Sequence, residues 1–136
     1  MTSRDFDWVK ARAECSAEAV FQRLRLSLQA DAESRTEMLL KANASYGFTT
    51  ISQGASISVF IQGGITEPRA VVFTHTESGI SVRDENDKLT IQATLTLNND
   101  GECRLKVADK ELELWQFRKL ALEDFFFSSP VSKRKA

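Results

Sequence analysis

In Leu89-Thr90-Ile91-Gln92-Ala93-Thr94-Leu95-Thr96-Leu97, apolar and polar residues alternate from end to end, and the predicted fold is built on this pattern. Successive side chains of a β-strand point to opposite faces, so this alternation predicts a half-buried strand over residues 88–98. The residues that follow, Asn98-Asn99-Asp100-Gly101, tolerate the positive φ of a tight hairpin turn. The chain is therefore predicted to reverse into a second strand over residues 102–107. The inward side chains of that strand are expected to be Cys103, Leu105 and Val107.

Other strands precede this pair and are separated from one another by short polar or glycine-containing connections. We expect them over residues 55–62, 69–76 and 79–83. Residues 48–53 are either one more strand or the first half of a bent one, because Gly54 marks a turn or a bulge. Short connections favour an up-and-down meander. The predicted sheet is therefore antiparallel and has about five strands.

Helical periodicity is found at both ends of the chain. Over residues 110–127, a step of about 100° per residue gathers most of the large apolar side chains in one arc, and Asp109 is a plausible N-cap. Near the N-terminus Ser16 is expected to cap a helix, and residues 30–44 either continue that helix or begin a second one. The predicted fold is α+β, with one face of the sheet covered by the N-terminal helix or helices and by a C-terminal helix.

Residues 5–13 leave the element order open, because they fit a helix or, through Phe6 and Trp8, a first strand. With a strand there, the order becomes strand, helices, meander and long helix. That order resembles the helix-grip arrangement of START-like ligand-binding domains, although no sequence motif accompanies the resemblance.

Length and charge restrict the class of protein. The 136 residues suit one hydrophobic core, and we expect a single domain over residues 1–129 with a flexible tail over residues 130–136. The net charge of −1 gives no long-range field to attract nucleic acid or anionic lipid. No apolar run approaches the length of a membrane span. We therefore expect a cytoplasmic protein without nucleic-acid or membrane partners.

The two cysteines, Cys15 and Cys103, are far apart in sequence and form no Cys-x-x-Cys pair. We expect both to be reduced and buried. Neither a metal site nor a cofactor is predicted.

An enzyme would have to use His75, the only histidine and the only side chain with an unperturbed pKa near neutrality. A nearby carboxylate such as Glu77 is its best partner. One histidine without neighbouring ligands is no catalytic constellation, so a strand histidine near a hairpin end is favoured. The sequence therefore favours a non-enzymatic protein over an enzyme, and no catalytic residue is assigned.

The C-terminal helix carries more apolar surface than one contact with a sheet requires. Leu120 and Phe127 lie off the main stripe, and Phe125-Phe126-Phe127 point in three directions. Arg118 falls inside the apolar arc, so its guanidinium must reach a carboxylate, a carbonyl or water. Either the N-terminal helix buries the surplus or a partner does. The leading hypothesis is a non-enzymatic binding or assembly module, a homodimer or a complex with another protein through this helix.

The main alternative is a carrier of a small apolar ligand, with a cavity between the sheet and the C-terminal helix. Its expected lining residues are Phe48, Phe60, Phe73, Ile91 and Trp115. Phe60 faces away from its apolar neighbours on the same strand, so the strand either bends or is covered on both faces. Its position therefore helps to distinguish a carrier from an assembly module. The candidate ligand or interface residues are Trp115, Arg118, Leu120, Phe126, Phe127, Phe60 and His75.

Overall fold

Seven strands form one antiparallel sheet in the computed structural model, which describes residues 5–64 and 67–128. Each strand pairs with its neighbours in chain order, so the predicted meander is confirmed with two strands more than expected. The expected tail over residues 130–136 lies outside the described residues. The strands are β1 (Tyr46–Gln53), β2 (Ser56–Gly63), β3 (Ala70–His75), β4 (Gly79–Asp84), β5 (Leu89–Leu97), β6 (Cys103–Val107) and β7 (Lys110–Leu112).

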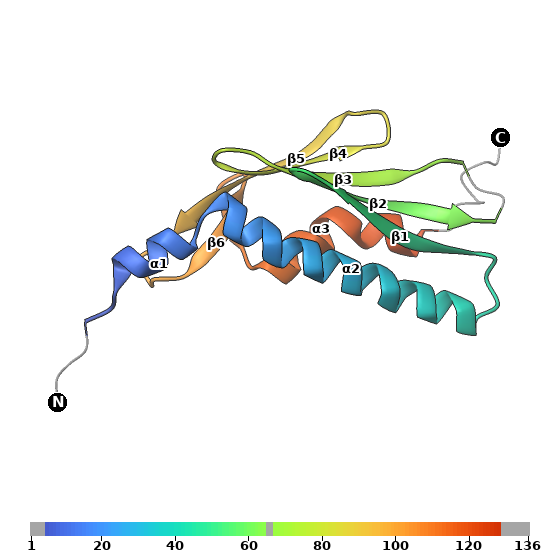
Figure 1. Cartoon of the computed structure of the whole chain (residues 1–136), viewed down its shortest axis with the longest axis horizontal. Helices are drawn as coiled ribbons and strands as arrows, with labels where there is room; N and C mark the ends of the chain where they lie inside the picture. Colours follow the sequence, from blue (N-terminus) through green and yellow to red (C-terminus); the bar gives the residue numbers. More distant parts are fainter. Residues whose placement is uncertain (1–4, 65–66, 129–136) are drawn as a thin grey trace.

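Two helices, α2 (Ala17–Lys41) and α3 (Leu114–Phe127), lie side by side on the same face of the sheet (Figure 1). The predicted cap of the first is confirmed, because the Ser16 hydroxyl accepts the N–H of Ala19 at 3.1 Å. No break occurs within α2, so residues 30–41 continue the helix that Ser16 begins. The α+β class and the covering of one sheet face by both helices are as predicted.

The open question over residues 5–13 is decided by a short helix, α1 (Trp8–Glu14). Its N-cap is Asp7, whose carboxylate accepts the N–H of Lys10 at 3.1 Å. Because a helix stands where a first strand would be needed, the START-like element order is not formed.

Aromatic side chains of α3 pack against aromatic side chains of the sheet. Phe117 of α3 meets Phe73 of β3 with ring centroids 6.1 Å apart, and Phe48 of β1 contacts both Phe125 and Phe126 at 5.1 and 4.8 Å. Each of these rings is buried. Helix α3 therefore covers the sheet as the periodicity predicted.

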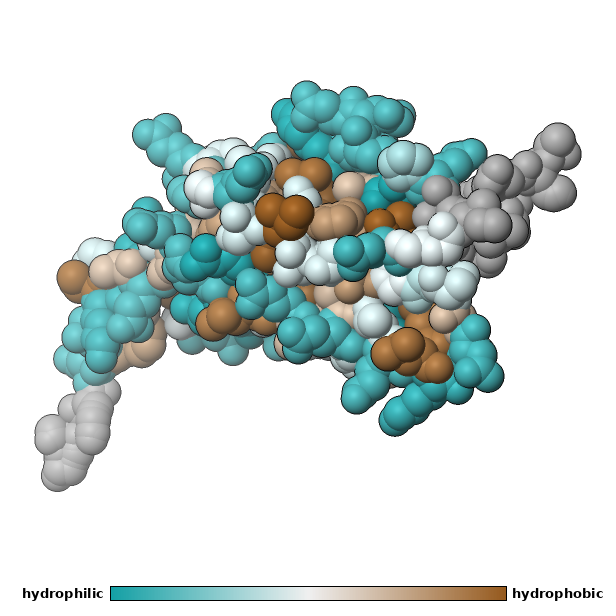
Figure 2. All heavy atoms as spheres, turned by 45° about the vertical axis from the view of Figure 1, so that its right-hand side comes forward, coloured by the Kyte–Doolittle hydropathy of each residue, from teal (hydrophilic) through white to brown (hydrophobic). Residues whose placement is uncertain are grey.

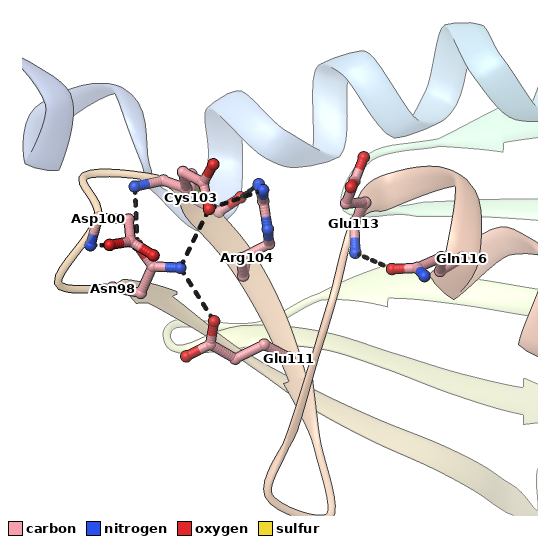
Figure 3. A network of polar contacts seen from close by, with 8 residues as sticks. Asn98, Asp100, Cys103, Arg104, Glu111, Glu113 and Gln116 are labelled. Carbon is pink, nitrogen blue, oxygen red and sulfur yellow. Dashed lines mark hydrogen bonds and ion pairs between the residues drawn. The ribbon is translucent and has the colours of Figure 1, made fainter.

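The hairpin between β5 and β6 follows from the side chain of Asn98. Its carbonyl oxygen accepts the N–H groups of Asp100 and Glu102, while Gly101 supplies the positive φ of 79°. The amide nitrogen of Asn98 donates to Glu111 of β7 at 3.0 Å (Figure 3). One asparagine thus joins the predicted turn to the edge of the sheet.

Strand β7 was not predicted, and Asp109 is not the cap of α3. Ala108 and Asp109 have φ of 49° and 68°, which is the backbone of a two-residue hairpin turn. The helix begins after Glu113 instead, whose N–H donates to Gln116 at 2.8 Å (Figure 3). The three residues of β7 are too few to show a period and consist of good helix formers, so they resembled the first turn of α3.

The prediction of reduced cysteines is wrong, because Cys15 and Cys103 form a disulfide with their Cα atoms 5.5 Å apart. The bond ties the junction of α1 and α2 to the start of β6 and closes a separation of 88 positions in sequence. Such a long loop removes much conformational freedom from the unfolded chain. Nothing in the sequence indicated this pairing, because the spacing of two cysteines along the chain carries no information on their proximity in the fold.

The outer edge of β1 is covered by α2. The hydroxyl of Thr36 accepts the N–H of Phe48 at 2.8 Å and donates to the carbonyl of the same residue at 3.0 Å. The Thr36 methyl also leaves no room for a Cβ at Gly47, which would lie 2.7 Å away. The helix is thereby held closely against the edge strand and satisfies part of its backbone.

Candidate interaction site on helix α3

A groove of about 330 Å³ runs between α2 and α3. Both of its walls are helical, so the backbone atoms that line it are already hydrogen-bonded and the side chains determine its chemistry. Apolar and charged side chains both line it, and each helix contributes both kinds. The lining residues are Asp31, Ser34, Arg35 and Met38 of α2, and Trp115, Arg118, Lys119, Leu122, Glu123, Phe126 and Phe127 of α3.

Three large apolar side chains of this groove remain largely exposed. The exposed fractions of Met38, Trp115 and Phe127 are 52, 53 and 63%. Leu120, on the neighbouring part of α3, is 54% exposed. Helix α2 therefore lies beside α3 without covering this apolar surface. On the face shown in Figure 2, apolar side chains reach the surface in several separate groups between polar ones.

A partly buried ion pair lies among the residues that line the groove. Arg118 donates to the two carboxylate oxygens of Asp31 from Nε at 2.7 Å and from Nη2 at 3.5 Å. The expectation that this guanidinium must reach an acceptor is thereby confirmed. The pair also links the middle of α3 to the middle of α2.

Arg35 provides a second polar link at the C-terminal end of α3. Its Nε donates to the carbonyl of Phe126 at 2.9 Å, and its guanidinium lies 4.2 Å from the centre of the Phe127 ring. The cation thus meets one of the helix's terminal carbonyls, where positive charge is favoured. An exposed aromatic ring is held in place by a residue of the other helix.

The contribution of α2 to this site was not predicted from the sequence. Asp31, Arg35 and Met38 follow the spacing i, i+4, i+7, which places them on one face of a helix. A continuous α2 would have brought that face next to the C-terminal helix. The uncertain boundary near residue 30 concealed this signal.

A second hollow, of about 480 Å³, lies on the other side of α3, against β6 and β7. Leu112, Gln116 and Leu120 line it together with three residues that also line the groove. These shared residues are Trp115, Lys119 and Glu123. The outward part of α3 is therefore a ridge with a depression along each flank.

Three of the predicted candidates do not belong to the exposed part of this surface. Phe126 lines the groove but is only 7% exposed and packs on Phe48, so it belongs to the core. Phe60 is half-buried on the opposite face of the sheet, between its strand partners Thr49 and Ala70. His75 is half-buried at the end of β3. Of the seven candidates, Trp115, Arg118, Leu120 and Phe127 come together.

His75 packs its ring against Phe21 of α2, with centroids 5.1 Å apart. Its Nδ1 is buried and has no hydrogen-bond partner in the described part of the chain. Glu77 follows in an exposed bend. These contacts place the histidine in the packing between sheet and helix.

The residues expected to line an apolar cavity do not gather around one space. Phe48 and Phe73 are buried against aromatic rings of α3, and Trp115 is on the outside of the same helix. Phe60 lies on the far face of the sheet. The groove is bordered by Trp115 but by none of the other four residues.

The acidic residues of the β4–β5 turn are engaged with the protein backbone. The carboxylate of Asp84 accepts the N–H groups of Asn86 and Lys88, and that of Glu85 accepts the N–H of Ala70. The hydrogen bonds from Lys88 and Asn86 lower the pKa of Asp84. Among residues 5–64 and 67–128, no three acidic, cysteine or histidine side chains come together to hold a metal ion.

Comparison with protein-family models, curated proteins and solved structures finds no match to this chain. None of the helices in the described residues combines the length and the apolar character that crossing a membrane requires.

Proposed function

We propose that this protein is a non-enzymatic binding or assembly module that self-associates through the outer surface of α3. One observation carries the proposal: Met38, Trp115 and Phe127 converge on a single groove while each remains more than half exposed. Large apolar groups gathered in this way gain free energy when a partner removes them from water. Met, Trp, Phe and Arg are also enriched in interfaces.

The polar groups of the surface support association rather than catalysis. Arg118 and Arg35 are already paired, with Asp31 and with the Phe126 carbonyl, so neither is held ready for a reacting group. Their role is to fix the apolar side chains beside them. A surface made rigid before binding loses less conformational entropy when it associates.

The disulfide changes the location that we propose. Cytoplasm is the expectation from the sequence, but disulfides persist mainly in oxidising compartments. The bond between Cys15 and Cys103 therefore favours secretion or another oxidising compartment. Measuring free thiols in protein isolated from its native cells tests this part of the proposal.

Sedimentation velocity over a range of concentrations tests self-association. We expect the wild-type chain to form dimers and Trp115→Glu to shift it strongly towards the monomer. Leu26→Glu is the matched control, because Leu26 is an exposed residue of α2, 67% accessible, that lines neither hollow. A wild-type chain that stays monomeric at high concentration would overturn the proposal.

A further inference from the structure

Four exposed side chains of α3 follow one another at intervals of four positions. They are Trp115, Lys119, Glu123 and Phe127. Residues four apart on a helix form a continuous ridge, and ridges of this kind mediate the commonest class of helix packing, with the axes crossing at about −50°. The two hollows beside α3 flank this ridge.

The chemical order along the ridge is apolar, positive, negative, apolar. Read in the opposite direction, it becomes apolar, negative, positive, apolar. A two-fold axis perpendicular to a helix reverses the direction of the second copy, so each residue meets the residue at the mirrored position. Two antiparallel copies of this ridge would therefore bring together opposite charges in the middle and aromatic rings at both ends.

We propose that the partner of α3 is the α3 helix of a second copy, antiparallel to it and related by a two-fold axis level with Ala121. Trp115 then faces the partner's Phe127, and Lys119 faces the partner's Glu123. This inference rests on the proposed function and specifies its geometry. Each ridge enters a hollow that flanks the other, which uses the shape of the surface as well as its charge.

The charges within one chain fit this arrangement. Lys119 Nζ already lies 3.0 Å from Glu123 Oε1. Pairing two copies turns this exposed ion pair into a ring of four alternating charges, in which each lysine lies between two carboxylates. Alternating charges fix register, because any pairing that opposes like charges is unfavourable.

Charge reversal at single positions tests the pairing. Lys119→Glu gives a ridge with two negative charges, and Glu123→Lys gives one with two positive charges. Each variant alone should self-associate about ten-fold more weakly or worse, and an equimolar mixture should recover dimers. Sedimentation of the separate and mixed variants measures this, and circular dichroism checks that each is folded.

The double variant Lys119→Glu/Glu123→Lys provides a second test that keeps the ion pair within the helix. It should dimerise with itself as the wild type does, yet avoid mixed dimers with the wild-type chain. If the wild type dimerises but the single reversals have no effect, or the mixture does not recover, the antiparallel pairing is wrong while self-association stands. A monomeric wild type would contradict both the antiparallel pairing and self-association.

Discussion

The guanidinium of Arg118 meets the carboxylate of Asp31 at 2.7 Å, although the two residues are 87 positions apart in sequence. This contact joins α3 to the middle of α2, and both residues line the groove. Together with the hydrogen bond from Arg35 to the Phe126 carbonyl, the pair fixes the position of α3 along α2. The position of Trp115, three residues before Arg118, depends on it.

A double-mutant cycle should measure this coupling. With Asp31→Asn and Arg118→Gln made singly and together, we expect a coupling energy of about 1 kcal/mol, because both side chains are only partly exposed. Urea unfolding at low protein concentration gives the four free energies. Arg83 and Asp87 form an exposed pair at 3.9 Å and serve as the control, with less coupling expected. Equal coupling in the two pairs would contradict the role given to Arg118.

The disulfide predicts a large loss of stability on reduction. Replacing Cys15 and Cys103 by serine should lower the free energy of unfolding by about 2–5 kcal/mol, since the bond restricts a long loop of the unfolded chain. Thermal unfolding with and without reductant measures the effect. The serine variant should show no response to reductant. Two titratable thiols in unreduced, denatured wild-type protein would show that the bond does not form.

The hydroxyl of Thr36 should matter more than its methyl group. Thr36→Val keeps the shape but leaves the N–H and carbonyl of Phe48 without their partner at the covered edge, at a cost of about 1–3 kcal/mol. Thr36→Ser retains the hydroxyl and should cost less. Chemical denaturation of the two variants compares them directly. A serine variant less stable than the valine variant would show that packing dominates here.

Acid should weaken the β4–β5 hairpin through Asp84. Hydrogen bonds from the Lys88 and Asn86 N–H groups hold the pKa of this carboxyl below its ordinary value of 3.8. The folded pKa lies below the unfolded one, so the stabilisation is complete above the unfolded value and is lost as the pH falls through the folded one. Asp84→Asn should therefore be less stable than the wild type at neutral pH. The difference should shrink in acid, as unfolding measured at several pH values would show. A constant difference at every pH would exclude this cause.

The sheet could be predicted because the signals for its strands and turns each lie within a short segment of sequence. Alternation along β5, turn residues after Asn98 and the Ser16 cap each act within a few positions of the chain. Strand β7 could not be predicted, since the reversal before it places Ala108 at positive φ, a conformation that its residue type does not announce. Residues 8–14 form a helix without any buried side chain, so no apolar stripe marked it.

The candidate site was only partly visible in the sequence, because four of the eleven residues that line the groove come from α2. The unusual place of Arg118 in an apolar arc showed that it needed an acceptor, but nothing local identified Asp31. The pairing of Cys15 with Cys103 was hidden for the same reason. Contacts between distant segments depend on the tertiary fold, and one sequence carries no direct record of them.

Phe126 and Phe127 are adjacent on α3 yet should respond oppositely to replacement by alanine. Phe126 is 7% exposed between Phe48 and Phe125, so Phe126→Ala should cost about 3–5 kcal/mol of stability through lost contacts and a cavity. Phe127 is 63% exposed, with Arg35 stacked on it, so Phe127→Ala should cost about 1 kcal/mol or less.

For self-association, the replacement of Phe127 should have the larger effect. At concentrations where both variants are folded, Phe127→Ala should weaken dimer formation strongly, because its ring is part of the exposed ridge. Unfolding curves and sedimentation of the same two samples separate the two effects. If Phe127→Ala dimerises as the wild type does while Phe126→Ala loses only stability, the ring of Phe127 is not part of the contact. The interface would then have to lie towards Trp115 and Leu120.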